Sequence, residues 1–128
     1  MRFLLDTHAL LWWFTNDAQL SNRARHVISN TDYDILVSAA SAWEIATKHR
    51  LGKLAEAADV VPRFEELVLA DGFTLLPISH RHGLRAGSFR VDHRDPFDRM
   101  LAAQAELESV QLITADKAFE QFEVLTYW

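Results

Sequence analysis

The hydrophobic and polar positions of the chain alternate between two kinds of segment. Short apolar runs, typical of buried strands, are each followed by a longer stretch compatible with a helix. The predicted strands are Arg2–Leu5, Asp34–Val37, Thr74–Pro77, Gln111–Thr114 and Glu123–Thr126. The predicted helices cover residues 8–15, 21–30, 41–50, 58–71, 80–87, 96–109 and 117–121.

This alternation predicts the fold class. Parallel strands need crossover connections, and helices in those connections cover both faces of the sheet. We therefore expect an α/β fold, a three-layer α/β/α sandwich with a central, mostly parallel sheet. The 128 residues suit one domain, residues 1–128, because no repeat or linker-like tract interrupts the alternation.

Composition excludes several kinds of site. The absence of cysteine removes disulfides, thiolate metal sites and cysteine nucleophiles. The formal net charge of −5 does not by itself predict a nucleic-acid partner, so the distribution of charge matters more than the sum. The apolar stretch at residues 9–14 is far shorter than the ~18 residues of a membrane span, and no signal-peptide pattern precedes it. A cytoplasmic protein is the expectation.

Acidic residues stand where predicted strands lead into helices. Asp6 follows the first strand, Glu44 lies in the helical segment after the second, and Asp116 follows the strand that ends at Thr114. Asp98 lies at the start of the helix predicted from residue 96. Functional sites of open parallel sheets form outside the carboxyl ends of the strands, so the topology aims all four acids at one edge. Asp6 and Asp116 also suit a purely structural role as helix N-caps.

The other two acids have structural interpretations as well. Ser41 and Glu44 have the S-x-x-E spacing of a capping box. Pro96 favours the first turn of a helix, which makes Asp95 the natural N-cap and Asp98 the third helical residue. Asp98 then begins a face that continues through apolar residues at helical spacing and should look inward. An acid there needs compensation of its charge.

A divalent metal ion is the simplest compensation. Carboxylates crowded above apolar strands repel one another and are poorly solvated, so they take up protons or bind a cation. Oxygen ligands without cysteine favour Mg²⁺ or Mn²⁺. Such an ion suits phosphodiester hydrolysis, because it activates water and stabilises the leaving oxygen. The histidines show no metal-binding spacing, although His8 and His93 are near enough to the proposed site to touch substrate.

Four motifs resemble the PIN-domain ribonucleases, in particular the VapC-type toxins of bacterial toxin–antitoxin modules. They are LLDTHALLWW, SAASAWEIATKHRLGKL, HRDPFDRMLAAQA and LITAD, and they cover nearly the whole chain. The resemblance implies a Mg²⁺- or Mn²⁺-dependent endoribonuclease of three-layer fold. It also implies a catalytic, metal-binding pocket formed by Asp6, Glu44, Asp98 and Asp116. Asp98 rather than Asp95 matches the family's acid, because RMLAAQA follows it.

Other residues are assigned supporting roles. Thr7 and Thr114 flank two of the acids, where their hydroxyls either orient a carboxylate or water or cap helices, and Asp95 is a further supporting candidate. Basic side chains near the acids are candidates for contacts with RNA phosphates, and surface ion pairs are the alternative. These candidates are Arg81, Arg85, Arg94, Arg99, His93 and Lys48.

The resemblance further implies partners. These are an RNA substrate, an antitoxin whose C-terminal segment lies across an apolar groove near the active site, and a second copy of the toxin in a homodimer or hetero-oligomer. Trp12, Trp13 and Phe14 are adjacent, so one helix face cannot bury all three, and an aromatic should be left exposed or covered by a partner. Trp43 is expected to anchor its helix.

Two other interpretations compete. A phospho-receiver domain also has an acidic pocket on a doubly wound sheet, but it needs an acid pair after the first strand. Here Asp6 is followed by Thr7, and LPIS after the third strand offers no aspartate. The second alternative is a catalytically degenerate PIN fold that serves only as a binding module, and the presence of all four acids argues against it.

Overall fold

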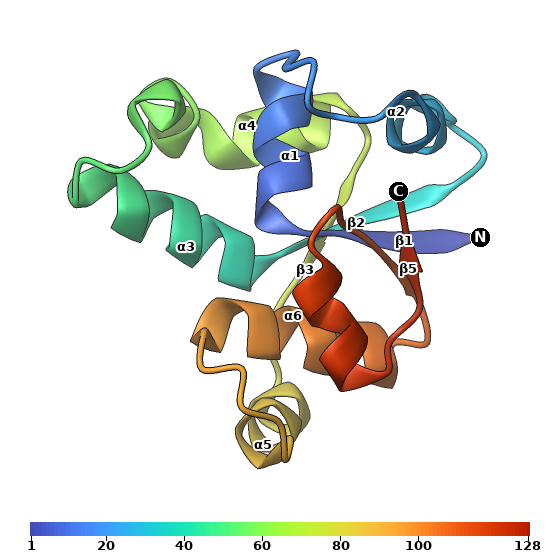
Figure 1. Ribbon diagram of the computed structural model, residues 1–128. Helices are drawn as coiled ribbons and strands as arrows, with labels where there is room; N and C mark the ends of the chain where they lie inside the picture. Colours follow the sequence, from blue (N-terminus) through green and yellow to red (C-terminus); the bar gives the residue numbers. More distant parts are fainter.

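A single sheet forms the centre of the computed structural model, which describes residues 1–128 (Figure 1). Its five strands have the order β3-β2-β1-β4-β5, and every neighbouring pair is parallel. The strands are β1 (Arg2–Leu5), β2 (Asp34–Ser38), β3 (Thr74–Leu76), β4 (Gln111–Ile113) and β5 (Thr126–Tyr127). The prediction of a mostly parallel sheet is confirmed, and the carboxyl ends of all the strands meet at one edge.

Helices cover both faces of the sheet, which confirms the three-layer α/β/α sandwich. Packed on one face are α1 (Thr7–Phe14), α2 (Asn22–Ser29), α4 (Phe64–Ala70) and the inner side of α3 (Ala39–Arg50). Packed on the other are α5 (His80–Ser88), α6 (Pro96–Leu107) and the 3₁₀ segment η3 (Lys117–Phe122). None of these helices has the length and apolar character needed to cross a membrane.

The central strands β1, β2 and β4 are mostly apolar because helices bury both faces of the sheet there, whereas the edge strands β3 and β5 are more exposed. Successive residues of a strand point to opposite sides, and in a parallel sheet helices cover each side. In β1, Phe3 and Leu5 therefore pack among α1, α2 and α4, whereas Leu4 packs against α5 and α6. All three side chains are at most 2% exposed. The continuous apolar runs that predicted the strands reflect this two-sided burial.

The segment before β3 departs from the prediction of one helix over residues 58–71. The chain forms two 3₁₀ turns, η1 (Ala55–Ala57) and η2 (Val61–Arg63), and only then α4. Pro62 lies in the first turn of η2. Proline has no backbone N–H and its ring disfavours a helical residue before it, so a continuous α-helix cannot run through this position.

The last strand also lies later than predicted. Glu123 ends η3 with a φ of 58°, in the left-handed region, and this conformation cannot begin a strand. Pairing with β4 starts only at Thr126, which is in register with Leu112. The strand predicted at Glu123–Thr126 is therefore displaced to Thr126–Tyr127.

Helix α3 begins before the predicted residue 41, and this changes the role of Glu44. Ser38 is the N-cap, and its hydroxyl accepts the backbone N–H of Ala40 at 2.9 Å. Ser41 and Glu44 therefore lie inside the helix, where both are buried. The predicted capping box between them is wrong, because neither residue is at the helix terminus.

The three adjacent aromatic residues of α1 are all partly buried. Trp12, Trp13 and Phe14 are each half-buried against the core of α1, α2 and α4. Trp12 packs edge-on against Trp128 with ring centroids 5.9 Å apart, and the Trp13 indole N–H donates to Asp71 Oδ2 at 2.9 Å. No aromatic of the three is fully exposed, so the expectation of one left outside is not met.

Candidate active site at the carboxyl edge of the sheet

Asp6 connects β1 to α1, and hydrogen bonds hold its backbone N–H and both of its side-chain oxygens. Its backbone N–H donates to the Ile113 carbonyl of β4 at 3.0 Å. Its Oδ1 accepts the Ala9 N–H at 2.7 Å, which caps α1, and its Oδ2 accepts the hydroxyl of Thr114. The side chain is only 6% exposed, and burial raises the pKa of Asp6 to about 6 against the opposing effect of both hydrogen bonds. Asp6 is therefore both a cap and a destabilised buried charge.

Glu44 reaches the same region from α3. A hydrogen bond of 3.0 Å between the Thr7 and Ser41 hydroxyls joins the start of α1 to α3, one helical turn before Glu44 on the same face. Glu44 is 3% exposed, and its Oε2 accepts a charged hydrogen bond from Lys48 Nζ. Its Oε1 is buried with no hydrogen-bond partner. An unpaired buried carboxylate oxygen is costly, and it marks a position where a donor or cation is missing.

Asp98 lies in the first turn of α6. Its Oδ2 is 2.8 Å from His93 Nε2. Burial raises the pKa of Asp98 to about 6 against the opposing effect of that hydrogen bond, and the negative charges of Asp95 and Glu44 raise it further. The Asp98 charge also adds to the raised pKa of Asp6. These couplings bring Asp6, Glu44 and Asp98 into one electrostatic group.

The prediction that Asp95 caps α6 is confirmed. Asp95 Oδ1 accepts the backbone N–H of Phe97 at 2.9 Å, and Pro96 occupies the first turn. The face that begins at Asp98 also behaves as predicted, because Leu101 and Ala102 are completely buried. Asp98 therefore lies at the exposed end of a face of α6 whose following residues are buried.

Asp116 acts as a helix N-cap, which is the structural role that its position also suits. It is exposed and caps η3, with Oδ1 accepting the Ala118 N–H at 2.9 Å. Its backbone N–H donates to Thr114 Oγ1 at 3.0 Å, and the Thr114 hydroxyl in turn donates to Asp6. Thr114 therefore orients a carboxylate, as predicted, and links Asp116 to the group. Thr7 contacts Ser41 instead of an acid.

The side chains of this region offer oxygen ligands of the kind that a divalent ion binds. No three of the Asp, Glu and His side chains are close enough to form a ready metal-binding cluster. Mg²⁺ does not require one, since it keeps several waters and uses one or two protein carboxylates. The unpaired Glu44 Oε1 and the raised pKa values of Asp6 and Asp98 are the signs of a site that lacks positive charge. The oxygen donors present therefore fit such an ion.

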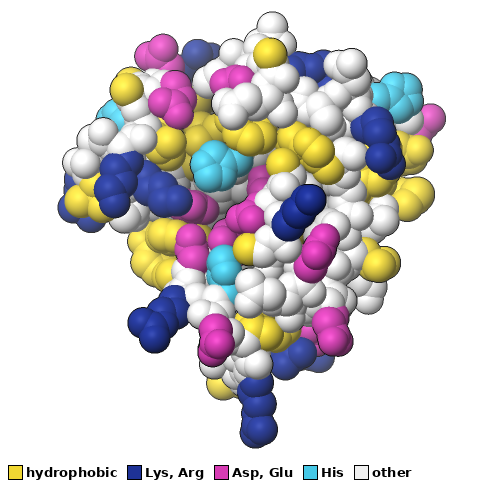
Figure 2. Space-filling model, viewed as in Figure 1, with side chains coloured by type: hydrophobic (Ala, Val, Ile, Leu, Met, Phe, Trp, Pro, Cys, Tyr) yellow, Lys and Arg dark blue, Asp and Glu magenta, His cyan; other side chains and the backbone are white.

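The surface over these residues is hollowed. In Figure 2, acidic side chains gather in a hollow near the centre of the face, between the α1 and α3 layer and α6, with histidine side chains on two sides. Beside it, an open pocket of about 620 Å³ is lined by residues 91–94 and Arg99. Of the four acids, Asp98 and Asp116 retain accessible surface, whereas Asp6 and Glu44 are buried.

Several of the basic residues predicted to contact phosphates already have partners. Arg85 forms a two-bonded ion pair with Glu106, at 2.9 and 3.0 Å, and stacks over Phe89. Arg99 directs its guanidinium at backbone carbonyls of the loop before α6, and Lys48 binds Glu44. Two further candidates, Arg81 and Arg94, are exposed.

The prediction that Trp43 anchors its helix is wrong. The inward face of α3 is set by residues such as Ala40, Ser41 and Glu44, and Trp43 is turned about 100° from Glu44 around the axis. Its side chain is 59% exposed and contacts only the edge of Phe97 among the aromatics, with centroids 4.7 Å apart. Sequence periodicity around Glu44 is the signal that would have predicted this exposure.

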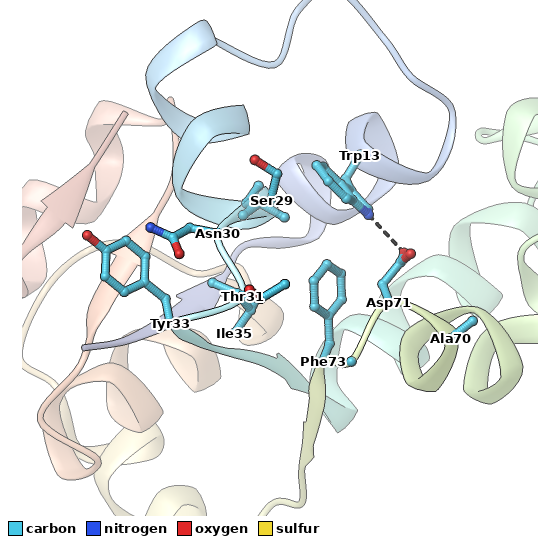
Figure 3. A pocket seen from close by; sticks show the side chains of 11 residues that line it. Trp13, Ser29, Asn30, Thr31, Tyr33, Ile35, Ala70, Asp71 and Phe73 are labelled. Atoms are coloured by element: carbon cyan, nitrogen blue, oxygen red, sulfur yellow. Dashed lines mark hydrogen bonds between the residues drawn. The ribbon is translucent and has the colours of Figure 1, made fainter.

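A second cavity lies at the opposite edge of the sheet, beyond the amino ends of β2 and β3 (Figure 3). Its volume is about 410 Å³. Trp13, Tyr33 and Phe73 line it, and Asp71 is its only charged lining residue. The Asp71 carboxylate is occupied by the Trp13 indole, as Figure 3 shows. This cavity has no set of converging acids and offers no comparable chemistry.

Comparison with known proteins supports the resemblance inferred from the motifs. Residues 3–125 match the family model described as PIN domain. Ribonuclease VapC16 of Mycobacterium tuberculosis is 35% identical over 65 residues, which are 51% of this chain and 46% of that protein. The match thus spans about half the length of this curated relative.

Solved structures agree with the fold. VapBC2 from Rickettsia felis, bound to a DNA fragment from the promoter, aligns with a TM-score of 0.68 and 15% identity, covering 100% of this chain and 99% of that one. FitAcB from Neisseria gonorrhoeae aligns with a TM-score of 0.67 and 19% identity, covering 98% and 96%. At these identities the structures establish a common fold.

Proposed function

The chain belongs to the PIN-domain family, and from this premise we propose that it is a metal-dependent endoribonuclease, the toxin of a toxin–antitoxin pair. The observation that carries the proposal is the group formed by buried Asp6 and Glu44 with half-buried Asp98 at the carboxyl edge of the sheet, with the Glu44 Oε1 left unpaired. A fold stabilised only by packing has no use for such a group, because each buried charge opposes folding.

The residues that would hold Mg²⁺ or Mn²⁺ are Asp6, Glu44, Asp98 and Asp116. A bound ion would lower the pKa of water and offset the negative charge of the phosphate. Thr114 fixes the carboxylate plane of Asp6, and His93 does the same for Asp98. Asp95 supports the site by capping the start of α6, the turn that carries Asp98. Each of these side chains orients oxygen ligands that the chain itself supplies.

RNA is the proposed substrate, and exposed cations are the proposed phosphate contacts. Arg94 lines the pocket beside the hollow, whereas Arg81 lies at the start of α5, next to His82, which contacts Glu108 after the end of α6. Arg81 and Arg94 have the exposed guanidinium groups suited to this role. Lys48, His93, Arg85 and Arg99 are engaged within the protein, so any contact they make with RNA requires exchange of a present partner. We expect the activity in the cytoplasm, where cellular RNA is found.

An antitoxin is the proposed protein partner. The structures aligned above include a VapBC complex, and the curated relative is named a VapC ribonuclease. The exposed Trp43 and a neighbouring apolar groove of about 180 Å³, lined by Phe97, Ile78 and Met100 among others, lie beside the acids. This surface would be covered by the partner chain in a homodimer or in a toxin–antitoxin hetero-oligomer.

A second candidate, a PIN fold that binds without cutting, is favoured by one observation: no three ligands are already gathered for a metal ion. Cleavage itself separates the two. The purified protein should cut RNA with Mn²⁺ and stop with EDTA, and Asp6→Asn should lower the rate by at least about 10²-fold because it removes a charge from the metal site.

Asp32→Asn is the matched control for that experiment. It makes the same chemical change at an exposed acid before β2, at the opposite edge of the sheet. The control should cut like the wild type, and identical purification of all three proteins accounts for contaminating nucleases. Equal rates for Asp6→Asn and the wild type would refute the assignment, and absence of metal-dependent cleavage would favour the binding module.

A further inference from the structure

Lys48 places a positive charge inside the acidic group. It lies one turn after Glu44 on α3, and its ammonium binds Glu44 Oε2. The Glu44 side chain is 4% exposed and the Lys48 side chain 31%, so the pair sits at the boundary between core and hollow. A carboxylate buried to this degree needs a cation, since an unpaired charge in such a place is strongly destabilising.

The same ammonium faces two further acids, which come from the start of α6. The negative charges of Asp95 and Asp98 act on this ammonium in addition to the Glu44 carboxylate that it binds. Lys48 is therefore a permanent positive charge directed at acids from both α3 and α6. These include two of the carboxylates proposed to hold the metal.

The ammonium leaves the group incompletely neutralised. It bonds only one of the Glu44 oxygens, and Oε1 remains buried without a partner. The single positive charge of Lys48 thus offsets part of the negative charge of the acids, and a divalent ion would offset more of it.

We propose that Lys48 is the resident counterion of the site, which neutralises the acids in the metal-free protein and competes with the divalent ion for them. The inference rests on the proposed function, because it requires the acids to be a metal site. The two cations repel each other at short range, so the ammonium must withdraw from Glu44 when the ion binds. Lys48 thereby sets the metal concentration at which the site fills and becomes available to a substrate phosphate.

The test measures Mn²⁺ binding by calorimetry on Lys48→Met, which keeps the length of the side chain and removes its charge. Lys48→Met should bind Mn²⁺ about tenfold more tightly than the wild type, because the competing charge is gone. Its melting temperature in EDTA should fall, and Mn²⁺ should raise that temperature by more than in the wild type. If Lys48 were only a structural ion pair, its loss would leave Mn²⁺ affinity unchanged or lower.

Controls separate charge from side-chain shape. Lys48→Arg keeps the charge and should bind Mn²⁺ about as the wild type does, and Lys53→Met removes an exposed lysine beyond α3 without changing Mn²⁺ affinity. In the wild type, Mg²⁺ should shift the NMR signals of the Lys48 side chain and leave those of Lys53 in place. This measurement needs no variant and remains available if Lys48→Met does not fold.

The outcomes distinguish this inference from the proposed function. Wild-type binding of Mn²⁺ that is lost in Asp98→Asn, together with no tighter binding by Lys48→Met and no Mg²⁺-dependent shift of Lys48, would overturn the counterion role alone. Absence of saturable Mn²⁺ binding in every form would overturn the metal site and the inference with it.

Discussion

Asp6 combines a stabilising role with a destabilising one. Its hydrogen bonds with Ala9 and Thr114 cap α1 and tie β1 to the end of β4. Burial nevertheless outweighs them, and the pKa stays near 6. Asp98 is in the same position, with His93 as its hydrogen-bond partner. Hydrogen bonds hold both side chains in position, although burial of their negative charges opposes folding.

This cost predicts how the metal-free protein responds to pH. The folded carboxyls of Asp6 and Asp98 take up protons near pH 6, whereas those of the unfolded chain do so near 3.8. Between these values the native state binds more protons, so the free energy of unfolding decreases as pH rises through the window. We expect the protein in EDTA to be about 1–3 kcal/mol more stable at pH 5 than at pH 7 from these groups.

Urea unfolding in EDTA at pH 5, 6 and 7 measures this effect. Asp6→Asn should be more stable than the wild type at pH 7 and show a shallower pH dependence, because asparagine caps equally well and carries no charge. Asp32→Asn should follow the wild type. A free energy of unfolding that does not change between pH 5 and 7 in EDTA would contradict the raised pKa values.

At the scale of elements, Arg99 organises the connection between α5 and α6. This connection has no regular structure, so its carbonyls need donors from elsewhere. The Arg99 guanidinium supplies them, with the shortest bond, 2.6 Å, to the Phe89 carbonyl. Its other acceptors are the carbonyls of Ala86, Gly87, Val91 and His93. The loop that presents His93 to Asp98 is thus shaped by the residue next to Asp98.

Replacing this planar donor with lysine should loosen the loop. An ammonium has fewer donors and no fixed fork, so Arg99→Lys leaves several carbonyls unpaired and should destabilise the protein by about 1–3 kcal/mol. Amide hydrogen exchange should accelerate in residues 89–95, and RNA cleavage should slow because His93 is less well placed. Arg94→Lys, an exposed change in the same loop, should leave exchange unaltered. Unchanged exchange in Arg99→Lys would refute the organising role.

At the scale of the whole molecule, charge opposes RNA binding except at particular points. The net charge is −5, and acids occupy the centre of the hollow. Cations that remain exposed near it are few, because Arg85 and Arg99 are engaged internally. RNA affinity should accordingly be modest and should depend on a small number of phosphate contacts.

The salt dependence of binding checks this expectation. The affinity of inactive Asp6→Asn protein for single-stranded RNA, measured by fluorescence anisotropy, should decrease with salt by a logarithmic slope of about 0.7 for each phosphate contact. Adding Arg81→Gln and Arg94→Gln should reduce the slope by up to about 1.4. Arg63→Gln, which changes the residue just before α4 and removes its ion pair with Glu66, is the matched control and should not alter it. An unchanged slope in the double variant would remove these two residues from the RNA site.

Features that depend on neighbours in the chain could be predicted from the amino-acid sequence. The run RFLL predicted β1 with its observed bounds, since a strand buried on both faces is apolar throughout. Asp95 and Pro96 predicted the start of α6, since a cap bonds to an amide two or three residues away. The metal-binding roles of Asp6, Glu44, Asp98 and Asp116 stay predictions.

Contacts between these groups depend on the packing of the folded chain and could not be predicted from local patterns. Thr114 reaches Asp6 across 108 residues because β4 lies beside β1 in the sheet. The exposure of Trp43 and the position of β5 likewise depend on how α3 packs and on where η3 ends. Local patterns specify strands, helices and caps because the bonds involved are short in sequence. Strand order and packing specify the partners of buried polar groups because those contacts join distant parts of the chain.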